Sequence, residues 1–254
     1  LDQIQQDKSH QVNSEGYIAE RLYDMLIGDW NKIPENWNWQ EIHTADSILF
    51  NPIVIDRSHA FTKVDGFFFQ RIPEGFGLGV FFDGFLFKRM LKVLGLGFIT
   101  NYSNHPKDIG EINTLGYTLD MALVSGVDES VWRTQALALQ KNLSDSVINE
   151  AFGALPPEIQ GAETEAIKKK LLIRRDSLPY MARRYYKKLQ RTPVLTGTEG
   201  DDRIILECSG HDSLLVRIYP KGSPVPSFQK KYSADSTEEI WLYGLGGDDE
   251  YEVI

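Results

Sequence analysis

The chain is poor in cysteine and in positive charge. Its 254 residues include one cysteine, Cys208, so neither an internal disulfide nor a cysteine-based zinc site can form. Lys and Arg number 27 against 36 Asp and Glu, and the resulting net charge of -9 argues against nucleic acid as a partner. The rest of the composition, 42% hydrophobic and 25% charged, is typical of a globular chain that can bury a core in one or two domains.

The sequence also lacks a long uninterrupted apolar run. Its most apolar stretch, Phe81–Phe98, lies in a region (67–98) that holds nine of the thirteen phenylalanines. The charged residues that interrupt it are Asp83, Lys88, Arg89 and Lys92. A membrane-spanning helix needs about 20 mostly apolar residues, so this stretch does not predict one. We expect a buried loop with a short helix; the alternative is a segment that contacts a membrane surface or a partner.

The two ends of the chain indicate a piece of a longer protein. Position 1 is leucine, and the pattern of a signal peptide does not follow it. The last residues, 251–254, alternate like a strand and stop without a turn signal. We therefore expect other parts of the same polypeptide to matter for function.

Residues 1–191 have the periodicity of a mainly helical domain. Residues 1–14 are polar and predict a leader into the first helix, and short strands are expected near 40–72. Apolar residues at helical spacing predict helices over 15–27, around Trp132, after a Ser144 cap, and over 163–175 and 177–190. After residue 191 short strand-like runs alternate with Gly, Pro, Ser and Asp, which predicts a small all-β domain over 192–254. The expected fold class is therefore α+β.

The β domain contains an internal repeat. Residues 194–204 and 241–251 each read as strand, G-x-x-G-D-D turn and strand. In such turns glycine supplies positive φ and aspartate bonds back to the backbone, so a structural turn is the simpler interpretation. The Gly-Asp-Asp pattern also resembles half of a calcium-binding β-roll repeat. Ca²⁺ takes six to eight oxygen ligands, and paired carboxylates beside backbone carbonyls can supply several of them. The candidate calcium ligands are Asp201, Asp202, Asp248 and Asp249.

Positive charge is concentrated in one window. Residues 163–191 contain ten basic and three acidic side chains, against the acidic balance of the whole chain. The four residues predicted to form the outer face of the last helix are Arg183, Arg184, Lys187 and Lys188. They are candidate anion-binding residues, although such a run is more often just the solvated face of a helix.

The sharpest site-like pattern lies at the end of the first helix. Gly28-Asp29-Trp30-Asn31-Lys32 is followed by Asn36-Trp37 and then by a β-type run that ends in Asp56-Arg57-Ser58. Kinase-like phosphotransfer uses this order: a loop Asp takes the hydroxyl proton, an Asn or Gln holds one metal, and an Asp at a strand end holds another. The candidate catalytic residues are Asp29, Asn31 and Asp56, and the candidate magnesium ligands are Asp29, Asn36 and Asp56.

These segments resemble the G-D-W-D-R-H-x-x-Q-W and D-R-D-x-A-F signatures of a bacterial multidomain family. In that family a calcineurin-like metallophosphoesterase region precedes such a segment, and an outer-membrane β-barrel of the surface-antigen type follows it. The stretches 155–159, 174–179 and 239–249 are similar to the same family, so the resemblance covers most of 15–254. It implies a degenerate kinase C-lobe-like domain over 1–191, partner domains on the same polypeptide, and a periplasmic or outer-membrane-associated location.

The chain departs from this family pattern at the positions that carry chemistry. Asn31, Lys32 and Ile33 stand where the pattern has D-R-H, and Ser58 replaces the second Asp of D-R-D. An asparagine has no useful proton affinity near neutral pH, so it cannot act as a general base. The leading hypothesis is a non-enzymatic structural or interaction segment. The alternatives are a phosphotransferase or phosphohydrolase part completed by other chain, and a calcium-binding adhesion or scaffold module.

Overall fold

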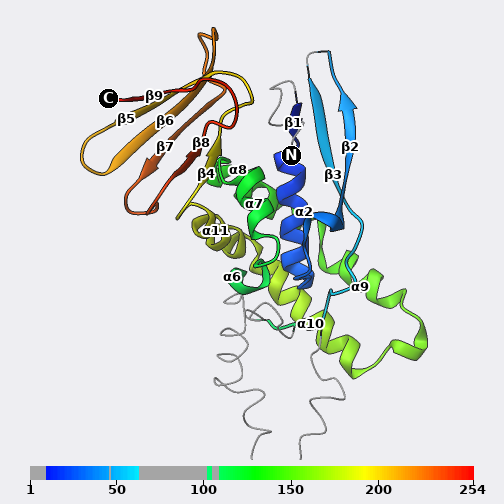
Figure 1. The fold of residues 1–254 in the computed structure, drawn as a ribbon. Coiled ribbons are helices and arrows are strands. Elements are labelled where there is room, and N and C mark those ends of the chain that lie inside the picture. Colours follow the sequence, from blue (N-terminus) through cyan, green and yellow to red (C-terminus); the bar gives the residue numbers. More distant parts are fainter. Residues whose placement is uncertain (1–9, 46, 63–101, 105–108) are drawn as a thin grey trace, which may run out of the picture.

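A single helix, α2 (Ser14–Ile27), is the centre of the N-terminal half (Figure 1). The computed structural model describes residues 10–45, 47–62, 102–104 and 109–254. Asn13 caps the start of α2, because its side-chain oxygen accepts a hydrogen bond from the Gly16 amide at 2.9 Å. The apolar residues that α2 buries completely are Tyr17, Ile18, Leu22, Met25 and Leu26. They recur at helical spacing, as the sequence predicts.

A three-stranded sheet flanks α2. Its strands are β1 (His10–Val12), β2 (Trp37–His43) and β3 (Ile48–Val54), in the order β1-β3-β2. Strands β2 and β3 form an antiparallel hairpin, whereas β1 runs parallel to β3. The loop between α2 and β2 contains one 3₁₀ turn, η1 (Pro34–Asn36). The hairpin carries the chain from this loop to Asp56, just beyond the end of β3.

The central region of the chain is helical. Its helices are α6 (Ile109–Ile112), α7 (Tyr117–Val124), α8 (Glu129–Asn142), α9 (Asp145–Gly153), α10 (Ala162–Asp176) and α11 (Leu178–Leu189), with the 3₁₀ turn η4 (Pro157–Ile159). Helices α8 and α11 pack through Trp132 and Tyr185, whose rings meet edge to face with centroids 5.7 Å apart. Both side chains are fully buried in the core that α2 shares with this region.

The C-terminal region is all β. Its strands are β4 (Val194–Thr196), β5 (Asp202–Cys208), β6 (Ser213–Pro220), β7 (Phe228–Ser233), β8 (Trp241–Tyr243) and β9 (Glu250–Val253). One sheet has the order β7-β6-β5-β9, and β4 pairs with β8 in a second. The two sequence repeats lie side by side, because Val194 pairs with Trp241 and Arg203 with Glu250 in parallel ladders, each pair 47 residues apart.

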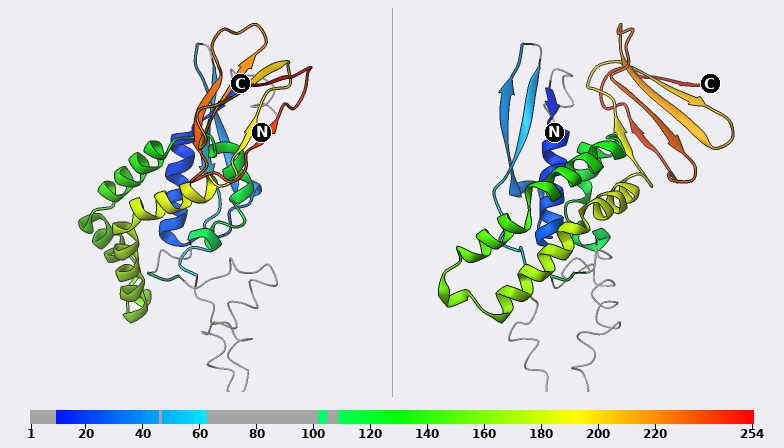
Figure 2. Two further views of the ribbon diagram at one scale, coloured as in Figure 1. Left: turned by 90° about the vertical axis from the view of Figure 1, so that its left-hand side faces the viewer. Right: turned by 180° about the vertical axis from the view of Figure 1, so that it is seen from behind.

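The β region packs directly on the helices. The Ser125 hydroxyl donates to the Val194 carbonyl at 2.8 Å, and Lys230 Nζ donates to the Val127 carbonyl at 2.9 Å. Figure 2 shows the two β regions at the same end of the helical region, on opposite sides of α2. The β region is therefore attached to the C-terminal end of α7 and to the turn that follows it.

The structure confirms the expected α+β class, with a small N-terminal sheet, a helical centre and a C-terminal β region. The interpretation of residues 1–14 as a leader is wrong for 10–12, which form β1 because their backbone pairs with β3. Residues 63–72 of the expected strand region, and the apolar segment Phe81–Phe98, lie outside the described residues. None of the helices in the described ranges is long and apolar enough to cross a membrane.

Candidate functional site

Helix α2 ends where the site-like motif begins. Gly28 has left-handed dihedral angles (φ 75°, ψ 27°), and the Asp29 amide donates to the Asp24 carbonyl at 2.9 Å. A Cβ added at Gly28 would also lie 2.6 Å from Cδ2 of the Tyr102 ring. Both the conformation and the close ring require glycine here. The chain thereby turns sharply and directs Asp29 into the interior.

A buried arginine from a distant helix caps the same end of α2. Arg174 of α10 donates from Nε to the Leu26 carbonyl at 2.9 Å and from Nη2 to the Met25 carbonyl. Its Nη1 donates to the Ser103 carbonyl at 2.7 Å. A cation is favourable at a helix C-terminus because the last carbonyls carry partial negative charge. One member of the basic window is thus buried and structural.

Lys32 is the cation at the centre of the motif. Its side chain is 1% exposed, and its ammonium group forms an ion pair with Asp29, whose side chain is fully buried. The same Nζ donates to the Asp56 carbonyl at 2.7 Å and lies 3.4 Å from Oδ1 of Asp24. Lys32 therefore neutralises Asp29 and ties the loop after α2 to the end of the β2–β3 hairpin.

Asp24 links this loop to two further cations. Its carboxylate accepts a hydrogen bond from Arg57 Nε at 3.0 Å, and Arg21 Nη1 lies 3.4 Å away. Burial raises the pKa of Asp24 to about 6, while Arg21, Lys32 and Arg57 oppose a further rise. Asp24 is consequently ionised at pH 7 and holds together the cations around it.

A second buried group, centred on Asp120 of α7, continues this network. Arg21 donates from Nε and Nη2 to the two oxygens of Asp120 at 2.8 and 2.9 Å. Tyr17 donates to the same carboxylate at 2.7 Å, and the Tyr185 hydroxyl also donates to it. Burial and the Asp120 charge raise the pKa of both tyrosines. The phenols therefore stay protonated, and this group ties α2, α7 and α11 together.

The predicted catalytic and metal residues have hydrogen-bond partners within the chain. The Asn36 amide Nδ2 donates to the Asn31 backbone carbonyl at 2.5 Å. The Asp56 carboxylate accepts a hydrogen bond from the Ser58 amide at 2.8 Å, a bond that lowers its pKa, and only its backbone carbonyl reaches Lys32. Among the described residues, no three His, Cys, Asp or Glu side chains are placed to share a metal ion. Lys32 thus contacts both Asp29, through its carboxylate, and Asp56, through its backbone carbonyl, whereas Asn36 bonds within the loop.

Three of the four turn aspartates of the β region, Asp201, Asp202 and Asp249, accept hydrogen bonds from backbone amides or from Thr198, and Asp248 takes part through its backbone amide. Asp201 Oδ1 accepts from the Asp248 amide at 2.8 Å, and Asp249 Oδ1 accepts from the Asp202 amide at 2.9 Å. Asp202 Oδ2 accepts from the Thr198 hydroxyl at 2.8 Å, and Lys221 forms an ion pair with Asp201. These contacts have the geometry of turn-stabilising aspartates.

The predicted anion-binding residues divide into two kinds. Arg183 Nε lies 3.5 Å from Glu129, and Arg184 Nη1 donates to the Tyr180 hydroxyl at 3.2 Å, both at the surface. Lys187 is exposed as well, whereas Lys188 donates to the Gly110 carbonyl at 2.7 Å and is half-buried. The structure places three of the four on an open helix face and uses the fourth to hold α6.

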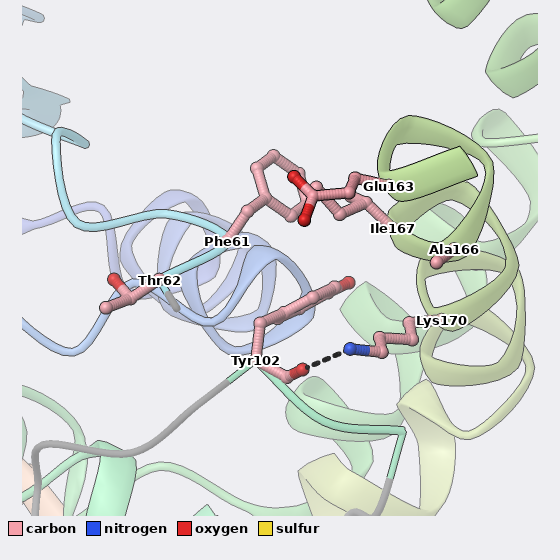
Figure 3. Close-up of a pocket in the computed structure, with 7 residues that line it drawn as sticks. All are labelled: Phe61, Thr62, Tyr102, Glu163, Ala166, Ile167 and Lys170. Carbon is pink, nitrogen blue, oxygen red and sulfur yellow. Dashed lines mark hydrogen bonds between the residues drawn. The ribbon is translucent and has the colours of Figure 1, made fainter. Parts of the chain in front are cut away.

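Two cavities among the described residues lie beside the motif. One, of about 300 Å³, is drawn in Figure 3 between Phe61, Tyr102 and α10, where Lys170 Nζ donates to the Tyr102 carbonyl at 3.0 Å. A neighbouring cavity of about 410 Å³ has almost entirely apolar walls from α2, α9 and α10. Asp29, Asn31, Asn36 and Asp56 line neither of them. Neither cavity therefore offers space for a substrate next to the candidate carboxylates.

Sequence reasoning missed the residues that dominate this site, namely Arg21, Asp24, Lys32, Asp120 and Arg174. For Arg21 and Asp24 the sequence does contain a signal of burial. Tyr17, Arg21 and Asp24 follow one another at i, i+4 and i+7, on the same face as the apolar stripe of α2. Charged residues on an apolar stripe indicate buried ion pairs. The partners could not be named, because Asp120 lies 99 residues from Arg21.

Comparison of the chain with models of known protein families, with curated proteins and with solved structures found no match.

Proposed function

We propose that this chain is a non-enzymatic structural or interaction segment of a periplasmic, outer-membrane-associated protein. Following the motif resemblance, its partners are a metallophosphoesterase-like region and an outer-membrane barrel on the same polypeptide. One observation carries the non-enzymatic part of the proposal. The ammonium group of Lys32 is bound to Asp29, the carboxylate of the kinase-like loop, and is itself buried.

The chemistry of the loop supports this proposal. A general base must accept a proton, and the amide of Asn31, at the position of the motif's base, has no such capacity near pH 7. A metal needs converging oxygen ligands, and the Asp56 carboxylate is turned toward its own loop at Ser58. The loop's polar groups instead hold α2 to the β2–β3 hairpin, which is a structural task.

A phosphotransferase or phosphohydrolase part is the second candidate, and the order of elements favours it. Helix α2, the polar loop, the β2–β3 hairpin and Asp56 follow one another as kinase-like phosphotransfer requires. This candidate requires a nucleotide-binding lobe that other parts of the polypeptide would supply.

A nucleotide-binding assay tests the non-enzymatic proposal. A fluorescent ATP analogue is titrated with the unchanged chain in the presence of magnesium and then of manganese, and its anisotropy is recorded. The proposal expects no saturable binding. Binding that Asp56→Ala abolishes, while the matched exposed variant Asp235→Ala retains it, would overturn the non-enzymatic proposal.

A further inference from the structure

The two repeats of the β region stack as coils. The first coil is residues 194–208 and the second coil is residues 241–254, and their turns are 197–202 and 244–249. Two reciprocal hydrogen bonds join the turns: the Asp248 amide donates to Asp201, and the Asp202 amide donates to Asp249. Each coil thus offers an aspartate to the turn of its neighbour.

Glycines let the two turns touch through their backbones. A Cβ added at Gly246 would lie 2.7 Å from the Glu199 carbonyl oxygen, and one at Gly247 would lie 2.6 Å from the Asp201 amide nitrogen. Contacts this short exclude any side chain at either position. A coil that stacks on the first coil therefore needs glycine at the third and fourth turn positions, in the form G-x-G-G-D-D.

The outer edge of the second coil is open among the described residues. There, within the part of the chain that the structure describes, β9 ends its sheet and β8 pairs only with β4. The Ile254 amide donates to Leu206 and the Ile254 carbonyl accepts from Cys208, both toward β5. Since partners alternate along a parallel strand, Tyr251 and Val253 direct their backbone groups to the outer side.

The side chains of this edge match an interaction surface. Large apolar residues of the second coil are 43–72% exposed, namely Trp241, Tyr243, Leu245, Tyr251, Val253 and Ile254. Asp248 is exposed and occupies, in the second coil, the position from which Asp201 accepts a neighbour's amide in the first coil. An unpaired strand edge with exposed apolar side chains is a template for an added strand.

We infer that the β8–β9 edge docks a third coil: a strand, a G-x-G-G-D-D turn and a strand, running parallel to the second coil. Its first turn aspartate donates its amide to Asp248, and its second accepts from the Asp249 amide, repeating the bonds between the first two coils. This docking edge is a surface through which the proposed interaction role would act. It does not depend on the Lys32–Asp29 ion pair, on which the non-enzymatic proposal rests.

A peptide with the sequence of residues 239–254, labelled with a fluorophore, tests this inference against the whole chain. Anisotropy should show saturable binding. Val253→Pro removes only an outward amide, so it should weaken binding about tenfold while Val253→Thr leaves it unchanged. Asp248→Ala should weaken binding several-fold, and a peptide with alanine at both turn glycines 246 and 247 should not bind.

Three results would overturn the inference. The first is no binding up to millimolar peptide. The second is equal binding of a scrambled peptide, or of the peptide with alanine at its turn glycines. The third is self-association of the chain that Val253→Pro abolishes without any peptide uptake, since a second copy would then hold the edge. Circular dichroism of Val253→Pro confirms that the fold is retained, and nucleotide binding in the earlier assay would leave all these outcomes unaffected.

Discussion

The helical region and the β region both contain aspartate-rich motifs, but they use the carboxylates differently. In the helical region, Asp24, Asp29 and Asp120 are buried and face lysine or arginine side chains, some of them from distant parts of the chain. In the β region, Asp201 and Asp249 accept from backbone amides of the neighbouring turn. An acidic motif is therefore no evidence of a metal site until the partners of each carboxylate are known.

The two regions should also differ in how much stability a single substitution removes. A buried ion pair contributes little net stability over apolar residues, but removal of one partner strands an uncompensated charge. A turn aspartate at the surface contributes one or two hydrogen bonds, and water replaces them when they are lost. The helical region should therefore respond more strongly to single substitutions than the β region does.

Asp120→Ala should give the largest effect. It leaves Arg21 buried without its bidentate partner and removes the acceptor of Tyr17 and Tyr185. We expect a loss of about 3–5 kcal/mol in the free energy of unfolding. Urea unfolding followed by circular dichroism measures it, with the exposed Asp235→Ala as control. A loss no greater than that of the control would contradict the description of the network.

Lys32→Met should give the next largest effect. The side chain keeps its length but no longer neutralises Asp29, so we expect a loss of about 3 kcal/mol. Adding Asp29→Asn should recover part of this loss, because the uncompensated charge is then gone. The coupling free energy from the four urea curves, with the exposed Lys187→Met as reference, measures the pair. A coupling energy near zero would show that the ion pair is unimportant.

Asp249→Ala should give a smaller and local effect. It removes the acceptor of the Asp202 amide, for which we expect a cost of about 1–2 kcal/mol. Hydrogen exchange should become faster in 194–208 and 241–254 and stay unchanged in α2. Equal acceleration in α2 would mean that the two regions unfold as one unit and that the contrast between them fails.

The smallest effect concerns pH. Folding raises the pKa of Asp24 from an ordinary value of 3.8 to about 6, so the folded state binds more protons between these values. The contribution of Asp24 to stability therefore falls as pH rises through this window and is constant above it, a change of about 1 kcal/mol between pH 5 and 7. Unfolding of the unchanged chain and of Asp24→Asn at both pH values measures the difference. Identical pH dependence in the two proteins would exclude a raised pKa.

Local patterns in the sequence were enough to predict most elements. Apolar spacing predicts α2, α10 and α11 within a residue or two, and Ser144 caps α9 as expected, since its hydroxyl accepts from the Val147 amide. Local patterns could not predict pairing between distant residues. Strand β1 (His10–Val12) is too short to show a strand pattern, and it is a strand because it pairs with β3. The repeat showed similarity between its two copies, but not that the copies stack.

The sequence predicted where the candidate site lies, but not the buried ion pairs that its residues form. The motif located the loop after α2, and the departures at Asn31 and Ser58 indicated a loss of catalysis. That Lys32 would be buried against Asp29 follows from the three-dimensional path of the loop, which places the ammonium group between two carboxylates and the Asp56 carbonyl. Spacing along the chain does not contain that information.

One thermal-unfolding series on the unchanged chain tests most directly whether the candidate carboxylates bind a ligand or serve only the structure. Melting temperatures are compared in chelator, with magnesium or manganese plus ATP, and with calcium. A ligand that binds only the folded state must raise the melting temperature. Because Asp29, Asp56 and Asp201 already have partners within the chain, we predict the same melting temperature in every condition. A rise with nucleotide and metal that Asp56→Ala abolishes, or a rise with calcium that Asp201→Ala abolishes, would contradict it.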